Sequence, residues 1–241
     1  MSQDARRTKR PRSTEYEAVG NGLARSLTRS ASPAAGVLQR GAAALSPHFG
    51  FIVLVGVGLA SLRLTHPLRL TLMWLVELVL VLLYAQTGKL KSSYSLLNLG
   101  RGLLVGIVVA LPLYLSAPHF FYATASWLYG VKDLQVLLER AVFLVPLLEG
   151  LYFRGAVQRE RGLLAGAVLY GLAQGLIVMS AGGAFPLVVL ALVLGMIVAG
   201  LLYGYLNQRY GLTASIAGHV TVSLVLFVLP ALSAAIVPLT G

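Results

Sequence analysis

Residues 147–155 read Leu-Leu-Glu-Gly-Leu-Tyr-Phe-Arg-Gly, and they place Glu149 and Arg154 five positions apart inside an otherwise apolar run. The run lies in a longer apolar segment that begins near Asp133 and ends near Gln158. A charged side chain near the centre of a bilayer costs at least about 2.5–3.5 kcal/mol on insertion scales. An acidic residue at such a depth is therefore predicted to belong to a functional site.

The composition indicates a membrane protein. Hydrophobic residues make up 57% of the 241-residue chain and charged residues only 11%. The apolar segments exceed what one small core could enclose, which argues against a soluble globular domain. Each transmembrane helix needs about 20 apolar residues, and the apolar part begins near His48. We expect an all-α, polytopic membrane helix bundle of about seven transmembrane helices.

Polar turns between the apolar segments give the approximate limits of these helices. The seven predicted spans are residues 49–64, 70–86, 103–116, 133–158, 163–180, 185–206 and 213–238. A basic, Ser-rich connection covers 89–101, and the aromatic-rich segment 118–130 is expected at a membrane–water boundary.

The chain has a net charge of +11, and eight of its basic residues crowd into the first forty positions, before the first predicted span. Residues 1–46 mix Arg, Ser, Thr, Gly and Pro with few aromatic residues, so we expect a mostly disordered basic tail, followed by a membrane domain over 47–241. Such a tail is expected to contact anionic lipid headgroups. Nucleic-acid binding is not predicted, because no fold that reads bases accompanies the tail. No cleaved secretory signal is expected either.

The basic connections predict the orientation. A cytoplasmic N-terminus places most of them on the inner side, as the positive-inside rule prefers, with Arg63 and Arg69 as exceptions. The predicted location is the cell inner membrane. Glu149 then lies about ten residues, roughly 15 Å, from the cytoplasmic end of its helix. Gln174 lies at a comparable depth in the span 163–180, and His219 lies somewhat shallower in the span 213–238, so the three side chains are predicted to meet at one buried site.

Small residues favour this meeting. Three pairs of glycines are spaced by four residues, which lets helix backbones approach closely. The pairs are Gly162/Gly166, Gly171/Gly175 and Gly200/Gly204.

Three short motifs, in this order, carry a family resemblance. Glu149 and Arg154 fit Glu-Glu-x-x-x-Arg, residues 170–174 fit Phe-x-x-x-His, and residues 219–223 fit His-x-x-x-Asn. With these motifs the segment 140–228 resembles the CPBP family of intramembrane glutamic endopeptidases, the CAAX proteases and bacteriocin-processing enzymes. Four positions depart from the pattern. They are Gly150 for the second Glu, Tyr170 for the Phe, Gln174 for the second-motif His, and Ser223 for the Asn.

The resemblance implies catalytic roles. Glu149 would be the general base, assisted in the family by the His at the position of Gln174, and His219 and Ser223 would lie at the oxyanion site. An amide can orient water but cannot carry a proton near pH 7, so activity is expected to be lower by the 10²–10⁴-fold typical of general acid–base catalysis. Tyr170 is predicted to pack beside the site as a supporting residue.

Arg154 is the second supporting residue. Five residues turn an α-helix by about 140° net, so Arg154 is expected to point away from Glu149. We expect it to reach the cytoplasmic headgroups or a loop carbonyl.

The predicted function is hydrolysis of peptide bonds in membrane-associated peptides or C-terminal protein tails. The alternative is a catalytically impaired CPBP homologue that acts as a membrane binding or partner subunit, which Gly150 and Gln174 favour. A third interpretation applies to each site residue: its polar group only forms a hydrogen bond between membrane helices. A transporter is disfavoured, because the two halves lack matching broken helices.

No cofactor is expected. A zinc site needs three or four ligands, and the buried supply is one His with one or two Glu. The absence of cysteine excludes thiolate catalysis. Glu77, in the span 70–86, is predicted either to pair with Arg69 or to line the cavity.

Overall fold

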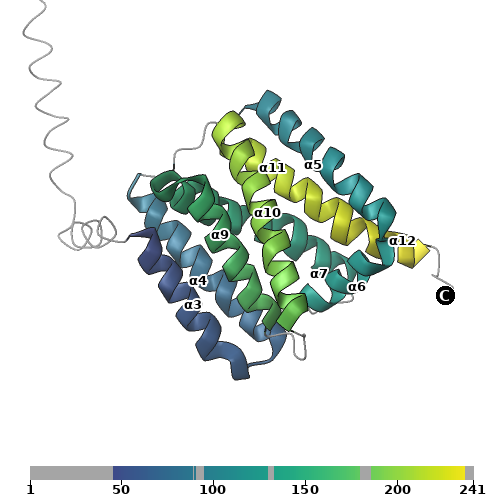
Figure 1. Cartoon of the computed structure of the whole chain (residues 1–241), viewed down its shortest axis with the longest axis horizontal. Helices are drawn as coiled ribbons and strands as arrows, with labels where there is room; N and C mark the ends of the chain where they lie inside the picture. The colour runs from purple at the N-terminus through teal and green to yellow at the C-terminus, as the bar shows by residue number, and fades with distance from the viewer. Residues whose placement is uncertain (1–45, 89, 91–94, 130–132, 180–185, 237–241) are drawn as a thin grey trace, which may run out of the picture. The chain divides into compact units, whose positions relative to one another are not determined.

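The computed structural model describes residues 46–88, 90, 95–129, 133–179 and 186–236. These residues belong to one compact unit, Ala42–Gly241. Several predicted parts of the chain lie outside them. They are residues 1–45 of the basic tail, most of the first half of the connection 89–101, the turn between the spans 163–180 and 185–206, and the end of the last predicted span. All the regular structure in the described residues is helical (Figure 1).

The helices follow one another with short connections. The α-helices are α3 (Pro47–Ala60), α4 (His66–Gln86), α5 (Leu96–Ser116), α6 (Pro118–Tyr129), α7 (Leu134–Leu138), α8 (Val145–Glu149), α9 (Gln158–Met179), α10 (Pro186–Tyr210), α11 (Leu212–Ser223) and α12 (Leu229–Ile236). A 3₁₀ turn, η2 (Ser61–Arg63), follows α3, and three π-helical segments, η3 (Glu139–Leu144), η4 (Gly150–Val157) and η5 (Leu224–Val228), are continuous with their neighbours.

Five helical runs are long and apolar enough to cross a membrane. They are His66–Gln86, Leu96–Ser116, Leu134–Met179, Leu187–Tyr210 and Leu212–Ser233, and Pro47–Arg63 is a shorter apolar helix. The run Leu134–Met179 has 46 residues, about twice one span. Gly162, with φ 86°, breaks its helical conformation, so its two arms correspond to the predicted spans 133–158 and 163–180. The prediction of an all-α, multi-pass membrane bundle is confirmed.

Hydrogen-bonded caps mark where several helices begin. Side chains that accept from the backbone N–H three residues later stand before α3, α5 and α7; they are Ser46, Ser95 and Asp133. An N-cap of this kind satisfies one of the unpaired donors of the first turn. Asp133, which the sequence suggested as a first-turn acid, is the residue just before the helix.

Glycines bring α9 and α10 together, as their spacing predicted. A Cβ atom on Gly171 would lie 2.3 Å from Ile197 Cγ1, and one on Gly204 would lie 2.3 Å from Leu163 Cδ1. Both distances are far shorter than carbon–carbon contact, so these positions admit no larger residue without movement. Gly162 has a different role, because it breaks the helix and a Cβ atom there would have nothing within 4 Å.

A second pair of glycines, Gly102 and Gly106 of α5, lets α11 pack closely against α5. This pair is not among those expected from the sequence. A Cβ on Gly102 would lie 2.2 Å from Ala214 O, and one on Gly106 would lie 2.6 Å from Thr221 Cβ. Figure 1 shows α5 running beside α11 at the edge of the bundle. Because α11 carries His219, this contact fixes one wall of the candidate site.

Arg69 connects three helices from a fully buried position. Its Nε donates to Gly58 O at 3.1 Å and its Nη2 to Leu176 O at 2.7 Å, which ties α4 to α3 and α9. No ion pair joins it to Glu77 within the described residues, so the predicted Arg69–Glu77 pair is wrong. Two carbonyl acceptors bind the guanidinium instead, and its Nη1 has no hydrogen-bond partner in the described residues.

We predict that Gly102→Ala lowers the thermal unfolding midpoint of the detergent-solubilised protein by several degrees. The new methyl group would overlap the Ala214 carbonyl, and overpacking typically costs about 1–3 kcal/mol. Gly100→Ala, two residues earlier on α5 with open space around it, is the matched control and should leave the midpoint unchanged or raise it. Equal effects of both variants would contradict the α5–α11 contact.

Candidate active site

Glu149 lies where the helix departs from α-helical geometry on both sides. It is the last residue of α8, with η3 before that helix and η4 after it. In π-helical segments each N–H bonds the carbonyl five residues back, and such segments are frequent at functional sites. Pro146 has no N–H to donate to the Val142 carbonyl, which gives a local reason for the irregularity.

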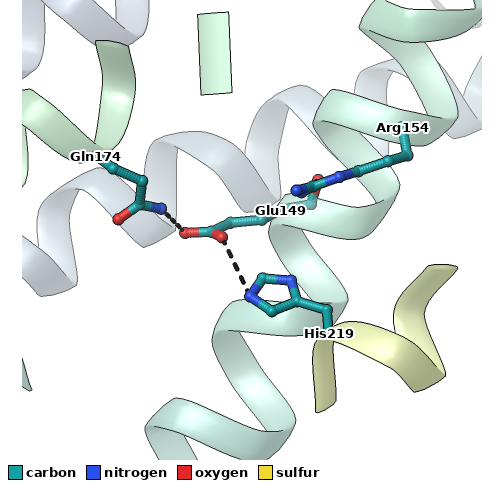
Figure 2. Close-up of polar contacts among 4 residues, drawn as sticks. All are labelled: Glu149, Arg154, Gln174 and His219. Atoms are coloured by element: carbon teal, nitrogen blue, oxygen red, sulfur yellow. Dashed lines mark hydrogen bonds and ion pairs between the residues drawn. The ribbon is translucent and has the colours of Figure 1, made fainter. Parts of the chain in front are cut away.

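Three helices bring polar side chains to the Glu149 carboxylate. Gln174 of α9 donates its Nε2 hydrogen to Glu149 Oε1, and His219 Nε2 of α11 lies 3.9 Å from Glu149 Oε2 (Figure 2). Glu149 is 1% exposed, and the other two side chains are also buried. The Tyr170 phenol is close to the same carboxylate. The predicted meeting of an acid, an amide and an imidazole is therefore observed.

Arg154 does not point away from Glu149. It is 2% exposed, and its Nη1 donates to the Glu149 backbone carbonyl at 3.2 Å. Figure 2 shows the guanidinium directed back toward Glu149. The prediction that it reaches the headgroups is wrong, because the 140° argument assumed an α-helix. In the π-helical segment η4, residues five apart lie about one turn apart. The acceptor of Arg154 is a carbonyl, as the alternative expected, but one within the helix and not in a loop.

The rings of Tyr170 and Tyr203 contact the Arg154 guanidinium, and Tyr203 also contacts the His219 imidazole. The Arg154 guanidinium carbon lies 4.1 Å from the Tyr170 ring centre and 5.0 Å from that of Tyr203. The Tyr203 ring also stacks on His219, with centroids 4.5 Å apart and an interplanar angle of 20°. Desolvated cation–π contacts of this kind contribute up to about 2 kcal/mol.

Sequence reasoning underestimated one of these tyrosines and missed the other. Tyr170 was predicted to pack, whereas it also contacts Arg154 and approaches Glu149. Tyr203 was given no role. Gly200, three residues earlier and so on the same helix face, could have indicated that Tyr203 points into the bundle.

A cavity of about 310 Å³ opens beside the carboxylate. Its polar wall contains Glu149, Gln174, His219 and Ser223, together with Tyr170 and Tyr203. The remaining wall is mostly apolar and comes from α5, α6, α10 and η5, with Val145 of α8 and Val222 of α11. Apolar cavities with a few convergent polar groups are typical of ligand and substrate sites. Glu77 is not among the lining residues, so its predicted place at this cavity is also wrong.

Gly150 faces a neighbouring helix. A Cβ at this position would lie 2.6 Å from Ile216 Cγ1 of α11, so a second glutamate here would require Ile216 to move. The second carboxyl group near Glu149 belongs to Glu77 of α4 and not to residue 150. Glu77 is buried and near enough to Glu149 and Arg154 for its charge to interact with both.

Seven buried polar side-chain atoms have no hydrogen-bond partner within the described part of the chain, and three of them belong to Glu149, Arg154 and His219. The seven are Arg69 Nη1, Trp74 Nε1, Glu77 Oε2, Glu149 Oε2, Arg154 Nη2, Ser215 Oγ and His219 Nδ1. Each such group costs about 1–3 kcal/mol, and a native protein keeps few of them. Over the same residues, no group of three or more His, Cys, Asp or Glu side chains could hold a metal ion.

Fold and site together define a multi-pass helical membrane protein with a carboxylate, an amide and an imidazole at the wall of an internal apolar cavity. Residues 133–225 match the family described as type II CAAX prenyl endopeptidase Rce1-like. No curated protein and no solved structure matches the chain. The matched segment contains the three motifs, so the CPBP resemblance is confirmed there. The match supports a CAAX-type intramembrane protease as the kind of protein.

We predict that Arg154→Met destabilises the protein by about 1–3 kcal/mol, because it leaves the Glu149 carboxylate without its nearby cation. Adding Glu149→Gln to Arg154→Met should recover part of this loss, since the uncompensated charge is then absent. Thermal unfolding in detergent measures both effects. The exposed Arg161→Met is the control. Strictly additive losses in the double variant would contradict the electrostatic role of Arg154.

Proposed function

We propose that this protein is an intramembrane endopeptidase that hydrolyses peptide bonds of membrane-associated peptides or C-terminal protein tails. The observation that carries the proposal is the buried Glu149 carboxylate at the cavity wall. Gln174 holds one of its oxygens, and the other faces His219. The Rce1-like match over the same residues supports the same kind of reaction.

In the proposed first step, Glu149 takes a proton from a water molecule in the cavity. The water oxygen attacks the carbonyl carbon of the substrate, and negative charge develops on the carbonyl oxygen. Gln174 keeps the carboxylate in place through its amide hydrogen bond. A positioned general base of this kind typically contributes about 10²–10⁴-fold to the rate.

His219 and Ser223 are the proposed donors to the developing oxyanion. They are one turn apart on α11, and both line the cavity. Stacking on Tyr203 holds the imidazole ring in place. Donors fixed in advance in a site shielded from water stabilise such a charge strongly, and losing one typically costs about 10²–10³ in kcat.

In the last step the carbon–nitrogen bond breaks, and protonated Glu149 gives its proton to the leaving amine. One carboxyl group thus performs both proton transfers and ends in its starting state. Glu149 has to perform both transfers because Gln174 cannot carry a proton near neutral pH.

The proposed membrane orientation places the N-terminus in the cytoplasm and the chain in the cell inner membrane. Arg101, at the start of α5, contacts Tyr210 at the end of α10, and Arg159 and Arg161 are exposed at the start of α9. Basic residues at helix ends favour the cytoplasmic side. Residues 1–46 are the proposed tail on anionic lipid headgroups, and 47–241 the proposed membrane domain.

The second candidate function is a binding or partner subunit that keeps the cavity without the chemistry. Two observations favour it. Ile216 fills the space beside Gly150, and an amide that cannot transfer protons occupies the second-motif position. Such a protein would bind a membrane peptide in the cavity and leave it intact.

We predict that Glu149→Gln abolishes cleavage of a membrane-inserted peptide, because an amide cannot accept the proton of the attacking water. Glu139→Gln, an exposed carboxylate on the preceding segment, is the matched control and should retain full activity. Cleavage is measured by mass spectrometry of peptide products in proteoliposomes. Unchanged cleavage by Glu149→Gln would exclude it as the general base.

We also predict that Gln174→His raises the cleavage rate by about 10²-fold, the lower end of what a general acid–base group supplies. The exposed Gln135→His is the control for adding a histidine. If the chain and Gln174→His are both inactive, the triple variant Gly150→Glu, Ile216→Ala, Gln174→His is the next test. An inactive but folded triple variant that still binds peptides favours the partner subunit.

A further inference from the structure

The indole N–H of Trp74 is a hydrogen-bond donor without a partner in the described residues, and Trp74 lies near Glu149. It lies on the inner face of α4 and is 6% exposed, and its Nε1 has no partner in the described residues. The Arg140 guanidinium carbon lies 5.7 Å from the indole ring centre, and Arg140 Nη1 donates to Tyr129 O at 3.0 Å. The indole is therefore held in a fixed orientation by a residue that is itself anchored.

A second, small cavity joins Trp74 to the catalytic carboxylate. It measures about 10 Å³, and Trp74, Glu149, Gln174 and Tyr129 supply its polar side chains. Apolar residues complete the wall; they are Leu70, Leu128, Val145 and Ile177. Glu149 and Gln174 line both the large and the small cavity, so they form part of the wall between them.

The size and chemistry of the small cavity match one water molecule. About 10–15 Å³ with two to four polar partners is what a buried water requires. An indole N–H is a donor only, and a carboxylate is an acceptor only. A water can accept from the first and donate to the second, which would satisfy a donor that otherwise costs free energy when buried.

We propose that Trp74 binds a water molecule that donates a hydrogen bond to Glu149, so that Trp74 acts as a positioning residue for the general base. The water fixes the carboxylate from the α4 side, while Gln174 fixes it from α9 and His219 faces it from α11. The water site stands independently of catalysis. Its effect on turnover rests on the proposed protease function.

The water site is tested without any activity measurement. The chain has two tryptophans, so ¹⁵N-indole labelling gives two N–H signals, and Trp127→Phe assigns the signal of Trp74. In the protein in nanodiscs we expect a cross-peak between the Trp74 N–H and a long-lived water, and a changed Trp74 shift in Glu149→Gln. A Trp74 signal with neither the water contact nor the shift change would overturn the proposal.

The positioning role is tested by kinetics on a membrane peptide. Trp74→Phe keeps an aromatic ring and removes the N–H donor, and we expect kcat to fall about tenfold with KM unchanged, as for a slightly misplaced base. Trp127→Phe is the matched control and should leave both constants unchanged. Unaltered kcat in a folded Trp74→Phe overturns the positioning role. If the unmodified chain is inactive, the protease proposal fails, and the nuclear magnetic resonance result still decides the water site.

Discussion

A carboxylate inside a membrane bundle has to be held by other polar groups, and the structure is arranged around this constraint. Glu149 receives the Gln174 amide, faces the His219 imidazole and lies beside the Arg154 guanidinium. The amide and the imidazole come from α9 and α11, while Arg154 follows Glu149 in the same helical run, so these helices have to approach closely. Gly150 permits the approach of α11, because a Cβ atom there would lie 2.6 Å from Ile216 Cγ1.

Each buried charged side chain has an opposite charge or carbonyl groups near it, although some of their polar atoms remain unpaired. Glu149 and Glu77 lie near Arg154, while Arg69 donates to carbonyl groups of α3 and α9. Removing charges from water costs several kcal/mol per ion, so these groups are weak evidence for stability and better evidence for function. The unpaired atoms around Glu149 and His219 agree with this view, because a substrate or water could use them.

Much of this arrangement could be predicted from the sequence. Apolar segments separated by polar turns gave the all-α bundle, and the depths of Glu149, Gln174 and His219 along their helices gave their meeting. The direction of Arg154 could not be obtained this way. Residue patterns assume 3.6 residues per turn, and the π-helical segment after Glu149 changes which residues share a face.

Specific side-chain contacts between helices could not be predicted from the sequence either. Tyr203 against His219, Ile216 against Gly150, and Trp74 beside Glu149 each depend on how two helices rotate about their own axes. Hydropathy specifies which helices are in the membrane but not that rotation. Rotation is fixed by packing against neighbouring helices.

The most direct test of the account is a thiol cross-link, since the chain has no cysteine of its own. In native membranes, Glu149→Cys combined with His219→Cys is treated with a short bifunctional thiol reagent. Leu147→Cys with His219→Cys is the control, because Leu147 is 48% exposed on the outer side of the same helix. The account predicts an efficient link between positions 149 and 219 and little between 147 and 219. Linking of the control pair alone, or no link at 149 and 219, would contradict the shared buried site.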